Sequence, residues 1–255
     1  MHGPDLHPAE LERRARELSE IRAVLLDIEG TTTPIEFVHH VLFPYARAHT
    51  HQYLHQHAAD PGVRADVALL TAERAAEPPQ PGLPAWDPAD ALGSAEAYVY
   101  WLMDRDRKST GLKSLQGRIW EAGYRNGDLK GKGAVYDDVR PALARWRQAG
   151  RDIAIFSSGS VPAQRHLFAN TTAGDLSPYL TSYFDTTTGP KREPASYHRI
   201  AQALRRQPAE VLFISDVGAE LDAARAAGMQ TALCVRGSAP ATDQGHPVIR
   251  SFAEL

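Results

Sequence analysis

Two acids lie close together in the stretch from Ala23 to Thr33, AVLLDIEGTTT, where Asp27 and Glu29 follow an apolar run. An aspartate carboxylate can attack phosphorus and form an aspartyl-phosphate, which divides one difficult displacement into two easier ones. A second acid must then protonate the leaving oxygen and later activate water. Glu29 is placed for that acid/base role, although an acid after a strand, taken alone, often only caps a turn.

Residues farther along the chain suit the same chemistry. Ser157 and Ser158 lie in a Ser-Ser-Gly turn before a helical segment, where backbone N–H groups and hydroxyls can bind a phosphate. Asp216 ends another apolar run, and with Asp27 it would hold Mg²⁺, a hard cation that prefers a few carboxylates plus substrate phosphate and water. Lys191 would add a positive charge for the phosphate, but by itself it could be a solvated surface lysine.

Each of these groups also has a plainer interpretation. Glu220 could be an acid favoured by the helix dipole in a first helical turn, or it could join the metal site through water or by orienting a ligand. Ser157 and Ser158 are expected to cap the helix that follows as well as to bind phosphate, since both tasks use the same N–H groups.

The histidines between residues 39 and 57 invite a metal interpretation. His51 and His55 are four residues apart, and four others are near them, but the His-Glu-x-x-His pattern of zinc proteases is absent. We therefore expect a polar helix face here.

Alternating elements position the chemical groups. Strand-like runs cover residues 22–28, 151–157, 209–215 and 230–235, and helix-like stretches cover 138–149, 161–170, 194–206 and 219–229. This alternation predicts an α/β fold, a doubly wound parallel sheet. Ligands bind such sheets outside the carboxyl ends of the strands, so the polar groups should meet at one edge.

Residues 34–130 interrupt this alternation. They carry helical patterns and a Pro-rich connector over 77–88, with no strong strand signal. We therefore predict a core domain formed by 1–33 and 131–255 and an inserted, mainly helical cap domain over 34–130. Residues 1–20 are an N-terminal extension with a short helix over 8–20.

The composition excludes several classes of protein. Of 255 residues, 43% are apolar and 23% are charged, which is typical of a soluble globular protein. A formal charge of −3 gives no basic surface for nucleic acid, no apolar run is long enough for a membrane span, and the N-terminus lacks a secretory signal. The single cysteine, Cys234, is expected to be buried and is compatible with a reducing cytoplasm.

The motifs also carry a resemblance. DIEGT, FSSGS, the lysine in GPKREPASY, and ISDVGAE, in this order, resemble the four motifs of the haloacid dehalogenase superfamily. The tail DIEGTTTPI, followed by FVHHVLFPYAR and LKSLQGRIWEAGYRNGDLKG, resembles the enolase-phosphatases, or acireductone synthases, of methionine salvage. The similarity covers nearly the whole chain from about Ile21, whereas residues 58–92 match only loosely.

The resemblance implies a bifunctional enzyme with a haloacid dehalogenase-like (Rossmannoid) core. It would enolise and then dephosphorylate 2,3-diketo-5-methylthiopentyl 1-phosphate, giving 1,2-dihydroxy-3-keto-5-methylthiopentene. Asp27 and Asp216, with the main-chain oxygen of Glu29, would hold one Mg²⁺ per subunit. Ser157, Ser158 and Lys191 would bind substrate, with Lys191 also part of the catalytic set. The protein would be a cytoplasmic monomer.

Two alternatives remain open from sequence. A phosphatase or phosphomutase of the same superfamily would act on another small phosphorylated metabolite, but most such enzymes carry Asp where Glu29 stands. A non-catalytic scaffold would bind a partner through the helical insert, but every motif acid is present. The residue that removes the C1 proton is also open, since Glu29 and a cap residue both qualify.

Overall fold

The computed structural model describes residues 20–107, 109–237 and 245–255. The helix expected over residues 8–20, and with it nearly all of the N-terminal extension, lies outside the described residues. Within the described part of the chain, every helix is too short or too polar to cross a lipid bilayer.

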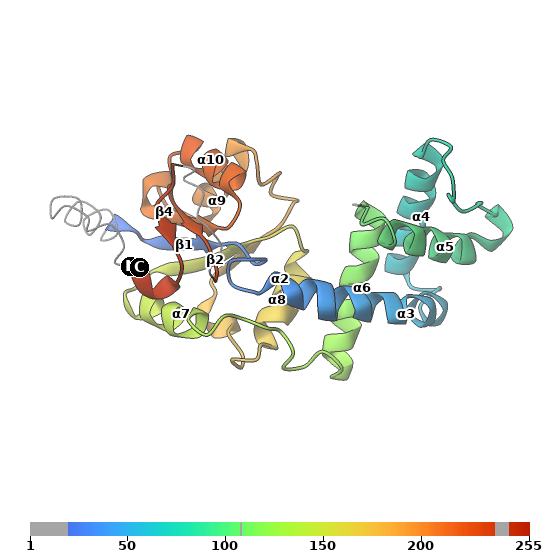
Figure 1. Ribbon diagram of the computed structural model, residues 1–255, viewed down its shortest axis with the longest axis horizontal. Helices are drawn as coiled ribbons and strands as arrows, with labels where there is room; N and C mark the ends of the chain where they lie inside the picture. Colours follow the sequence, from blue (N-terminus) through green and yellow to red (C-terminus); the bar gives the residue numbers. More distant parts are fainter. Residues whose placement is uncertain (1–19, 108, 238–244) are drawn as a thin grey trace.

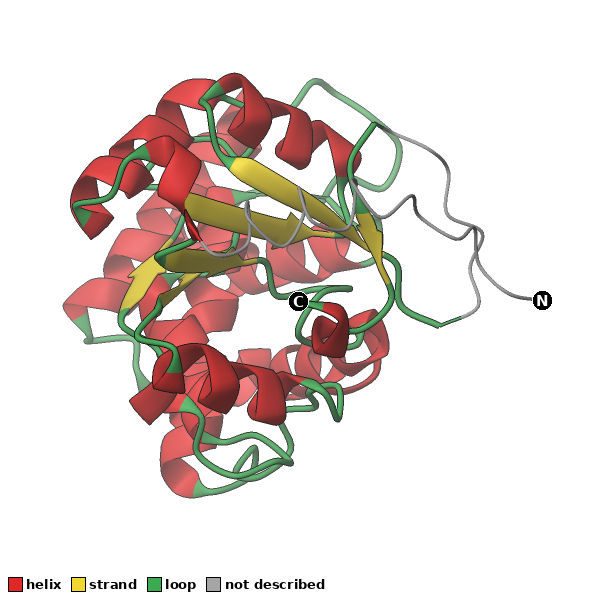
Figure 2. Ribbon diagram, turned by 90° about the vertical axis from the view of Figure 1, so that its left-hand side faces the viewer, coloured by secondary structure: helices red, strands yellow, loops and turns green. Residues whose placement is uncertain are grey.

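A six-stranded parallel sheet forms the centre of the fold, with the strand order β3-β2-β1-β4-β5-β6 (Figure 2). The strands are β1 (Ala23–Leu26), β2 (Asp152–Phe156), β3 (Ser182–Phe184), β4 (Val211–Ser215), β5 (Gln230–Cys234) and β6 (Val248–Ile249). Leu26 is in register with Ile155 of β2 and with Ile214 of β4. The three central strands therefore end at the same level, and the residues that follow them meet at one edge.

Helices cover both faces of the sheet, which is why its strands are apolar without alternation. The helices α7 (Val139–Gln148) and α8 (Val161–Ala169) pack with Val24 and Leu26 on one face. The helices α9 (Pro194–Leu204) and α10 (Gly218–Ala226) pack with Ala23 and Leu25 on the other (Figure 1). The predicted α/β fold with a doubly wound parallel sheet is confirmed, and Cys234 is buried as expected.

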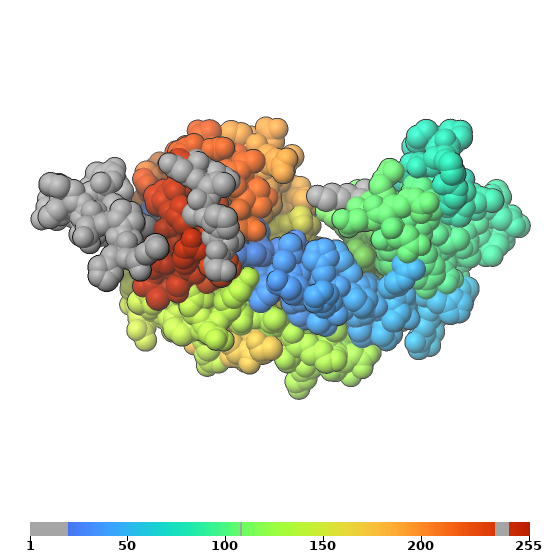
Figure 3. Space-filling view, in the orientation of Figure 1, coloured from blue at the N-terminus to red at the C-terminus, as the bar shows by residue number. Residues whose placement is uncertain are grey.

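The chain between β1 and β2 is helical. It holds α2 (Ile35–Phe37), the π-helical turn η1 (Val38–Leu42), α3 (Phe43–Gln56), α4 (Pro61–Ala76), η2 (Pro88–Asp90), α5 (Ala91–Met103) and α6 (Thr110–Asn126). These helices extend to one side of the sheet (Figures 1 and 3) and bury a hydrophobic cluster of their own around Leu54, Leu70, Tyr98 and Leu115.

The beginning and end of the helical segment pack on the sheet side. Phe37, Leu42, Tyr124 and Leu129 belong to the same buried cluster as Leu26 of β1. The indole N–H of Trp120 donates to the carbonyl of Leu42 at 2.8 Å, which ties α6 to η1. The helical segment is therefore attached to the sheet by two packed connections.

Candidate active site

Asp27 lies at the centre of the site, directly after β1, with only 5% of the residue exposed. Its Oδ1 accepts the backbone N–H of Ile28 at 2.7 Å and lies 2.7 Å from Lys191 Nζ. Its Oδ2 accepts the hydroxyl of Ser215, the last residue of β4, at 3.1 Å. Because a buried carboxylate is costly unless it is paired and hydrogen-bonded, these three contacts are what allow the charge at this position.

Lys191 reaches Asp27 from the loop between β3 and α9. Its Nζ also lies 2.6 Å from Oε2 of Glu220 in the first turn of α10. Burial alone would lower the pKa of Lys191, but the charges of Asp27 and Glu220 outweigh it and raise the pKa above its ordinary value. The loop is anchored because the Tyr197 hydroxyl donates to the carbonyl of Lys191 at 2.6 Å. Lys191 is therefore a fixed cation beside the candidate nucleophile.

Glu220, for which sequence left two roles open, is the second carboxylate on Lys191. Its Oε2 also accepts the Ser215 hydroxyl at 3.3 Å. Burial and the nearby charge of Asp27 raise its pKa. These contacts make Glu220 a positioning residue that orients Lys191.

Asp216 follows β4 and faces the loop after β1. Its Oδ2 lies 2.2 Å from the point that a Cβ on Gly30 would occupy, so only glycine fits beside it. Asp216 presents accessible surface, but protein surrounds its other sides. This partial burial, followed by the charges of Asp27 and Glu220, raises its pKa to about 6. Asp27 and Glu220 thus share one ammonium group with the third carboxylate, Asp216, nearby, which leaves an excess of negative charge.

This charge pattern fits a divalent cation. Asp27 and Asp216 supply the hard oxygen ligands that Mg²⁺ prefers, and Gly30 removes the side chain that would otherwise separate Asp216 from the loop carrying Glu29. A bound cation would relieve the repulsion that raises the pKa of Asp216.

Glu29 lies at the boundary between the sheet and the helical segment. Its backbone forms a bridge with Thr33, and its exposed side chain accepts no hydrogen bond from the described residues. Surrounding protein and the charge of Asp27 raise its pKa, whereas Lys191, His39 of η1 and Lys113 of α6 act in the opposite direction. A carboxyl group with a raised pKa and no fixed partner is suited to exchanging protons.

The Ser-Ser-Gly turn follows β2 at the same edge. Ser157 is buried, and its Oγ accepts the backbone N–H of Gly159 at 3.2 Å, whereas Ser158 is exposed. The expectation that these two serines cap α8 is wrong: Ser160 is the N-cap, and its Oγ accepts the N–H of Ala163 at 3.4 Å. The N-cap lies two residues after Ser158, which leaves the Ser158 hydroxyl unused by the helix.

Arg236 holds the loop after β1, and no sequence pattern indicated this contact. Its Nε and one terminal nitrogen donate to the carbonyl of Thr31 at 3.0 and 2.7 Å. Its other terminal nitrogen donates to Asp138 Oδ2 at 2.7 Å. Because Thr31 and Arg236 are 205 residues apart, no local pattern could have paired them.

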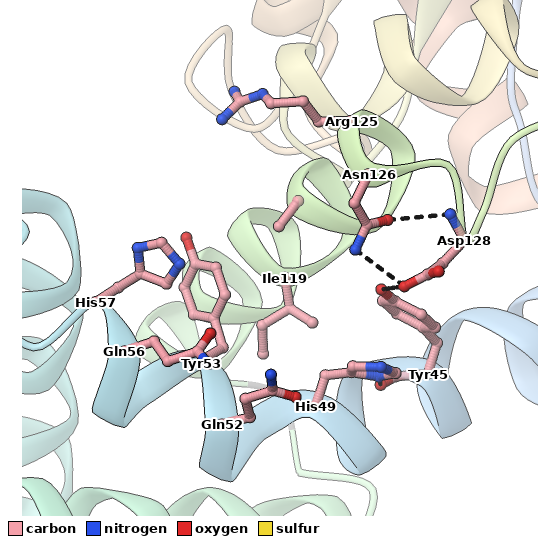
Figure 4. A pocket seen from close by; sticks show the side chains of 11 residues that line it. Tyr45, His49, Gln52, Tyr53, Gln56, His57, Ile119, Arg125, Asn126 and Asp128 are labelled. Carbon is pink, nitrogen blue, oxygen red and sulfur yellow. Dashed lines mark hydrogen bonds between the residues drawn. The ribbon is translucent and has the colours of Figure 1, made fainter.

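A cavity of about 370 Å³ lies elsewhere, between α3 and α6. Figure 4 shows Tyr45 and Asn126 both directed at Asp128, whose Oδ2 accepts from each at 2.9 Å. Because none of its lining residues belongs to the sheet edge, the cavity is separate from the candidate active site.

Comparisons with known proteins identify the family of this chain. Residues 21–228 match the haloacid dehalogenase-like hydrolase family. The chain is 56% identical to Enolase-phosphatase E1 of Synechococcus elongatus over 236 residues, which cover 92% of this chain and 98% of that one. It is 48% identical to Enolase-phosphatase E1 of Sorangium cellulosum, with coverage of 92% and 97%.

A solved structure is also similar. The crystal structure of the UTR4 protein from Saccharomyces cerevisiae matches with a TM-score of 0.70 at 34% identity, covering 92% of this chain and all of that one. The resemblance noted in the sequence is thus confirmed, and this chain belongs to the enolase-phosphatase E1 family of haloacid dehalogenase-like hydrolases.

Proposed function

We propose that this chain is a Mg²⁺-dependent acireductone synthase of methionine salvage. It enolises 2,3-diketo-5-methylthiopentyl 1-phosphate and then removes the phosphate. The observation that carries the proposal is the buried Asp27 carboxylate held by Lys191, with Glu29 beside it, in a chain whose curated relatives are named Enolase-phosphatase E1. The site joins a nucleophile, a fixed cation and a carboxyl group able to exchange protons.

Enolisation comes first. The C1 proton lies next to a carbonyl group, which acidifies it. When a base removes this proton, the electron pair forms the C1–C2 double bond, and the carbonyl oxygen at C2 takes up a proton from solvent. Glu29 is a candidate base because its raised pKa and free carboxylate suit proton exchange. His39 and Lys113 are the cap residues near Glu29 in this structure.

Phosphoryl transfer follows. An Asp27 oxygen forms a bond to phosphorus while the bond from phosphorus to the C1 oxygen breaks, and the leaving oxygen takes a proton from Glu29. Water then attacks the phosphorus of the aspartyl-phosphate and gives its proton to Glu29. This step frees Asp27 and inorganic phosphate. Lys191 remains beside Asp27 throughout and offsets the charge of the transferred group.

Binding uses the other groups at the sheet edge. Ser157, Ser158 and Lys191 bind the substrate phosphate through two hydroxyl groups and one ammonium group. Asp27, Asp216 and the main-chain oxygen of Glu29 hold one Mg²⁺. When bound, the cation supplies positive charge that stabilises the enolate and the transferring phosphoryl group.

The larger organisation belongs to the same proposal. Residues 1–33 and 131–255 form the core domain, and 34–130 form a cap that closes over the site and excludes water. Its separate hydrophobic cluster supports this division. By family resemblance the protein is a cytoplasmic monomer, and a single buried cysteine is consistent with a reducing compartment.

The first test uses the diketone phosphate with Mg²⁺. Ultraviolet absorbance of the enol and release of phosphate should both appear with the wild type, and Asp27→Ala should abolish the release of phosphate. Release of phosphate from generic esters without turnover of the diketone would instead support a phosphatase or phosphomutase. A wild-type rate in Asp27→Ala would support a non-catalytic scaffold with a contaminating activity.

The second test separates the two roles of Glu29. Glu29→Asp shortens the side chain by one methylene and is assayed for enolisation of the diketone and for hydrolysis of a prepared enol phosphate. Loss of enolisation alone would show that the longer acid serves the C1 proton. Equal loss of both activities would assign Glu29 to both proton transfers.

A further inference from the structure

Three potential metal ligands meet on the helical segment, away from the carboxylates of the active site. His51 and His55 are on α3, and Glu96 is on α5. Their ligand atoms all lie within 4.8 Å of one another. The His51 Nδ1 atom is 3.0 Å and the His55 Nε2 atom is 3.3 Å from the same Glu96 oxygen, Oε2. A spacing of four residues places both imidazoles on one face of α3, and α5 supplies the third group.

These separations match those between neighbouring ligands of one ion. Zinc binds histidine nitrogen and carboxylate oxygen at about 2.0–2.2 Å, so neighbouring ligands of a tetrahedral ion lie about 3.3–3.6 Å apart. Both histidine nitrogens are at or slightly inside that range from the Glu96 oxygen. Only a small adjustment of exposed side chains is needed to place an ion between them.

The charges also leave a place for a cation. Glu96 has a mostly shielded side chain, 18% exposed, and over the described ranges the two histidines are its only ion-pair partners. The two imidazole rings are 4.4 Å apart. A divalent ion bound to both imidazoles and to the Glu96 carboxylate would add positive charge beside this mostly shielded acid.

We propose that His51, His55 and Glu96 form a site for a transition-metal ion of the zinc class, distinct from the proposed Mg²⁺ site. Two nitrogen ligands and one oxygen ligand favour Zn²⁺, Co²⁺ or Ni²⁺ over Mg²⁺, which prefers oxygen alone. The imidazoles are 67% and 46% exposed, so the ion can enter from solvent and water completes its coordination. The bound ion cross-links α3 to α5 and stabilises the packing of the helical segment.

The sequence interpretation of a polar helix face omitted Glu96. Glu96 is far from both histidines along the chain, since it lies 45 residues after His51. The pairing depends on how α5 packs against α3, which the histidine spacing alone does not show.

The test titrates the full-length chain with Zn²⁺ at saturating Mg²⁺, by calorimetry and by the thermal unfolding midpoint. The wild type should bind one Zn²⁺ with a raised midpoint, because a ligand that binds only the folded state stabilises it. His51→Ala, His55→Ala and Glu96→Gln should each weaken that binding about tenfold or more. Co²⁺ should give the visible absorption bands of a four-coordinate ion in the wild type and lose them in the three variants.

Two matched variants serve as controls. His40→Ala removes another exposed histidine of the same region and should leave Zn²⁺ affinity unchanged. Asp216→Asn alters the active-site carboxylates and should leave the Co²⁺ spectrum unchanged. Unchanged Zn²⁺ affinity in all three ligand variants would overturn the proposal and leave an ion pair without a metal. Loss of binding in Asp216→Asn alone would place the ion in the active site and would also overturn it.

Discussion

Gly30 meets two requirements that only glycine satisfies: a left-handed backbone conformation and a lack of space for a side chain. Its φ of +71° is a conformation that residues with a side chain rarely adopt, and a Cβ there would lie 2.2 Å from Asp216 Oδ2. Gly131 has a similar φ of +66°, but none of the residues that the structure describes lies within 4 Å of the point where its Cβ would be. Comparing the two positions isolates the steric contribution from the backbone contribution.

We expect Gly30→Ala and Gly131→Ala to lose similar stability, about 1–2 kcal/mol each, because both place alanine in a left-handed conformation. Only Gly30→Ala should lose activity, by about 100-fold, because its methyl group displaces Asp216 from the site. Urea unfolding and phosphate release measure the two effects. Equal activity in the two variants would show that the position of Asp216 does not depend on Gly30.

The sequence predicted which residues form the candidate site but not the contacts that they make. The motif order placed Asp27, Lys191 and Asp216 together because strand ends share an edge. It could not assign Glu220 to Lys191, nor the helix cap to Ser160 rather than Ser157. The first outcome depends on the direction of a side chain, and the second on the exact residue at which a turn ends. Local sequence patterns do not determine either.

The segment after β5 holds the loop after β1 in place through Asp138 at the start of α7. Asp138 Oδ2 accepts the Ser251 hydroxyl at 2.8 Å and the Phe252 N–H at 2.6 Å, in addition to Arg236. Arg236 also stacks on the rings of Tyr136 and Phe252, 4.3 and 4.5 Å from their centroids. The C-terminal segment and the Thr31 carbonyl therefore share one buried network.

We expect Asp138→Asn to lower stability by about 2 kcal/mol at neutral pH, since it removes charge from several hydrogen bonds at once. Burial alone would raise the pKa of Asp138, but its hydrogen bonds from Arg236, Phe252 and Ser251 outweigh burial and lower it. A depressed carboxyl pKa gives stability that is complete above the unfolded pKa of about 3.9 and is lost as the pH falls through the folded value.

The difference between wild type and Asp138→Asn in urea unfolding should therefore stay constant from about pH 7 to about pH 5 and narrow below about pH 4. Ser251→Ala is the control because it removes one neutral donor and keeps the carboxylate. Ser251→Ala should lose less stability than Asp138→Asn, and its stability should depend on pH as that of the wild type does. A difference between wild type and Asp138→Asn that does not change with pH would contradict a role for the charge.

Elements with strong local signals were predictable, and those defined by their neighbours were not. β1, β2, β4 and β5 are apolar runs buried on both faces, so their patterns were clear. β3 has three half-buried residues, β6 has only two residues in all, and each exists because a longer strand pairs with it. α4 has a weak apolar stripe, diluted by alanines and charges, although Asp60 caps it through the N–H of Gly62.

The sheet and the helical segment contact each other around Glu29, so residues of both parts surround the candidate site. Lys113 at the start of α6 and His39 of η1 both lower the pKa of Glu29, so both lie near it. The resemblance covered the segment that contains Lys113 without giving it a role. Its role depends on how α6 sits over the sheet edge.

We expect Lys113→Gln to raise KM for the phosphorylated substrate about fivefold with little change in kcat, because an exposed charge contributes up to about 1 kcal/mol. The effect should shrink with added salt, which screens exposed charges. Lys130→Gln is the control, since Lys130 is also exposed but is not one of the groups that shift the pKa of Glu29. A fall in kcat with unchanged KM would instead indicate that Lys113 takes part in the proton transfers. Equal KM values in the two variants would show that Lys113 does not contribute to substrate binding.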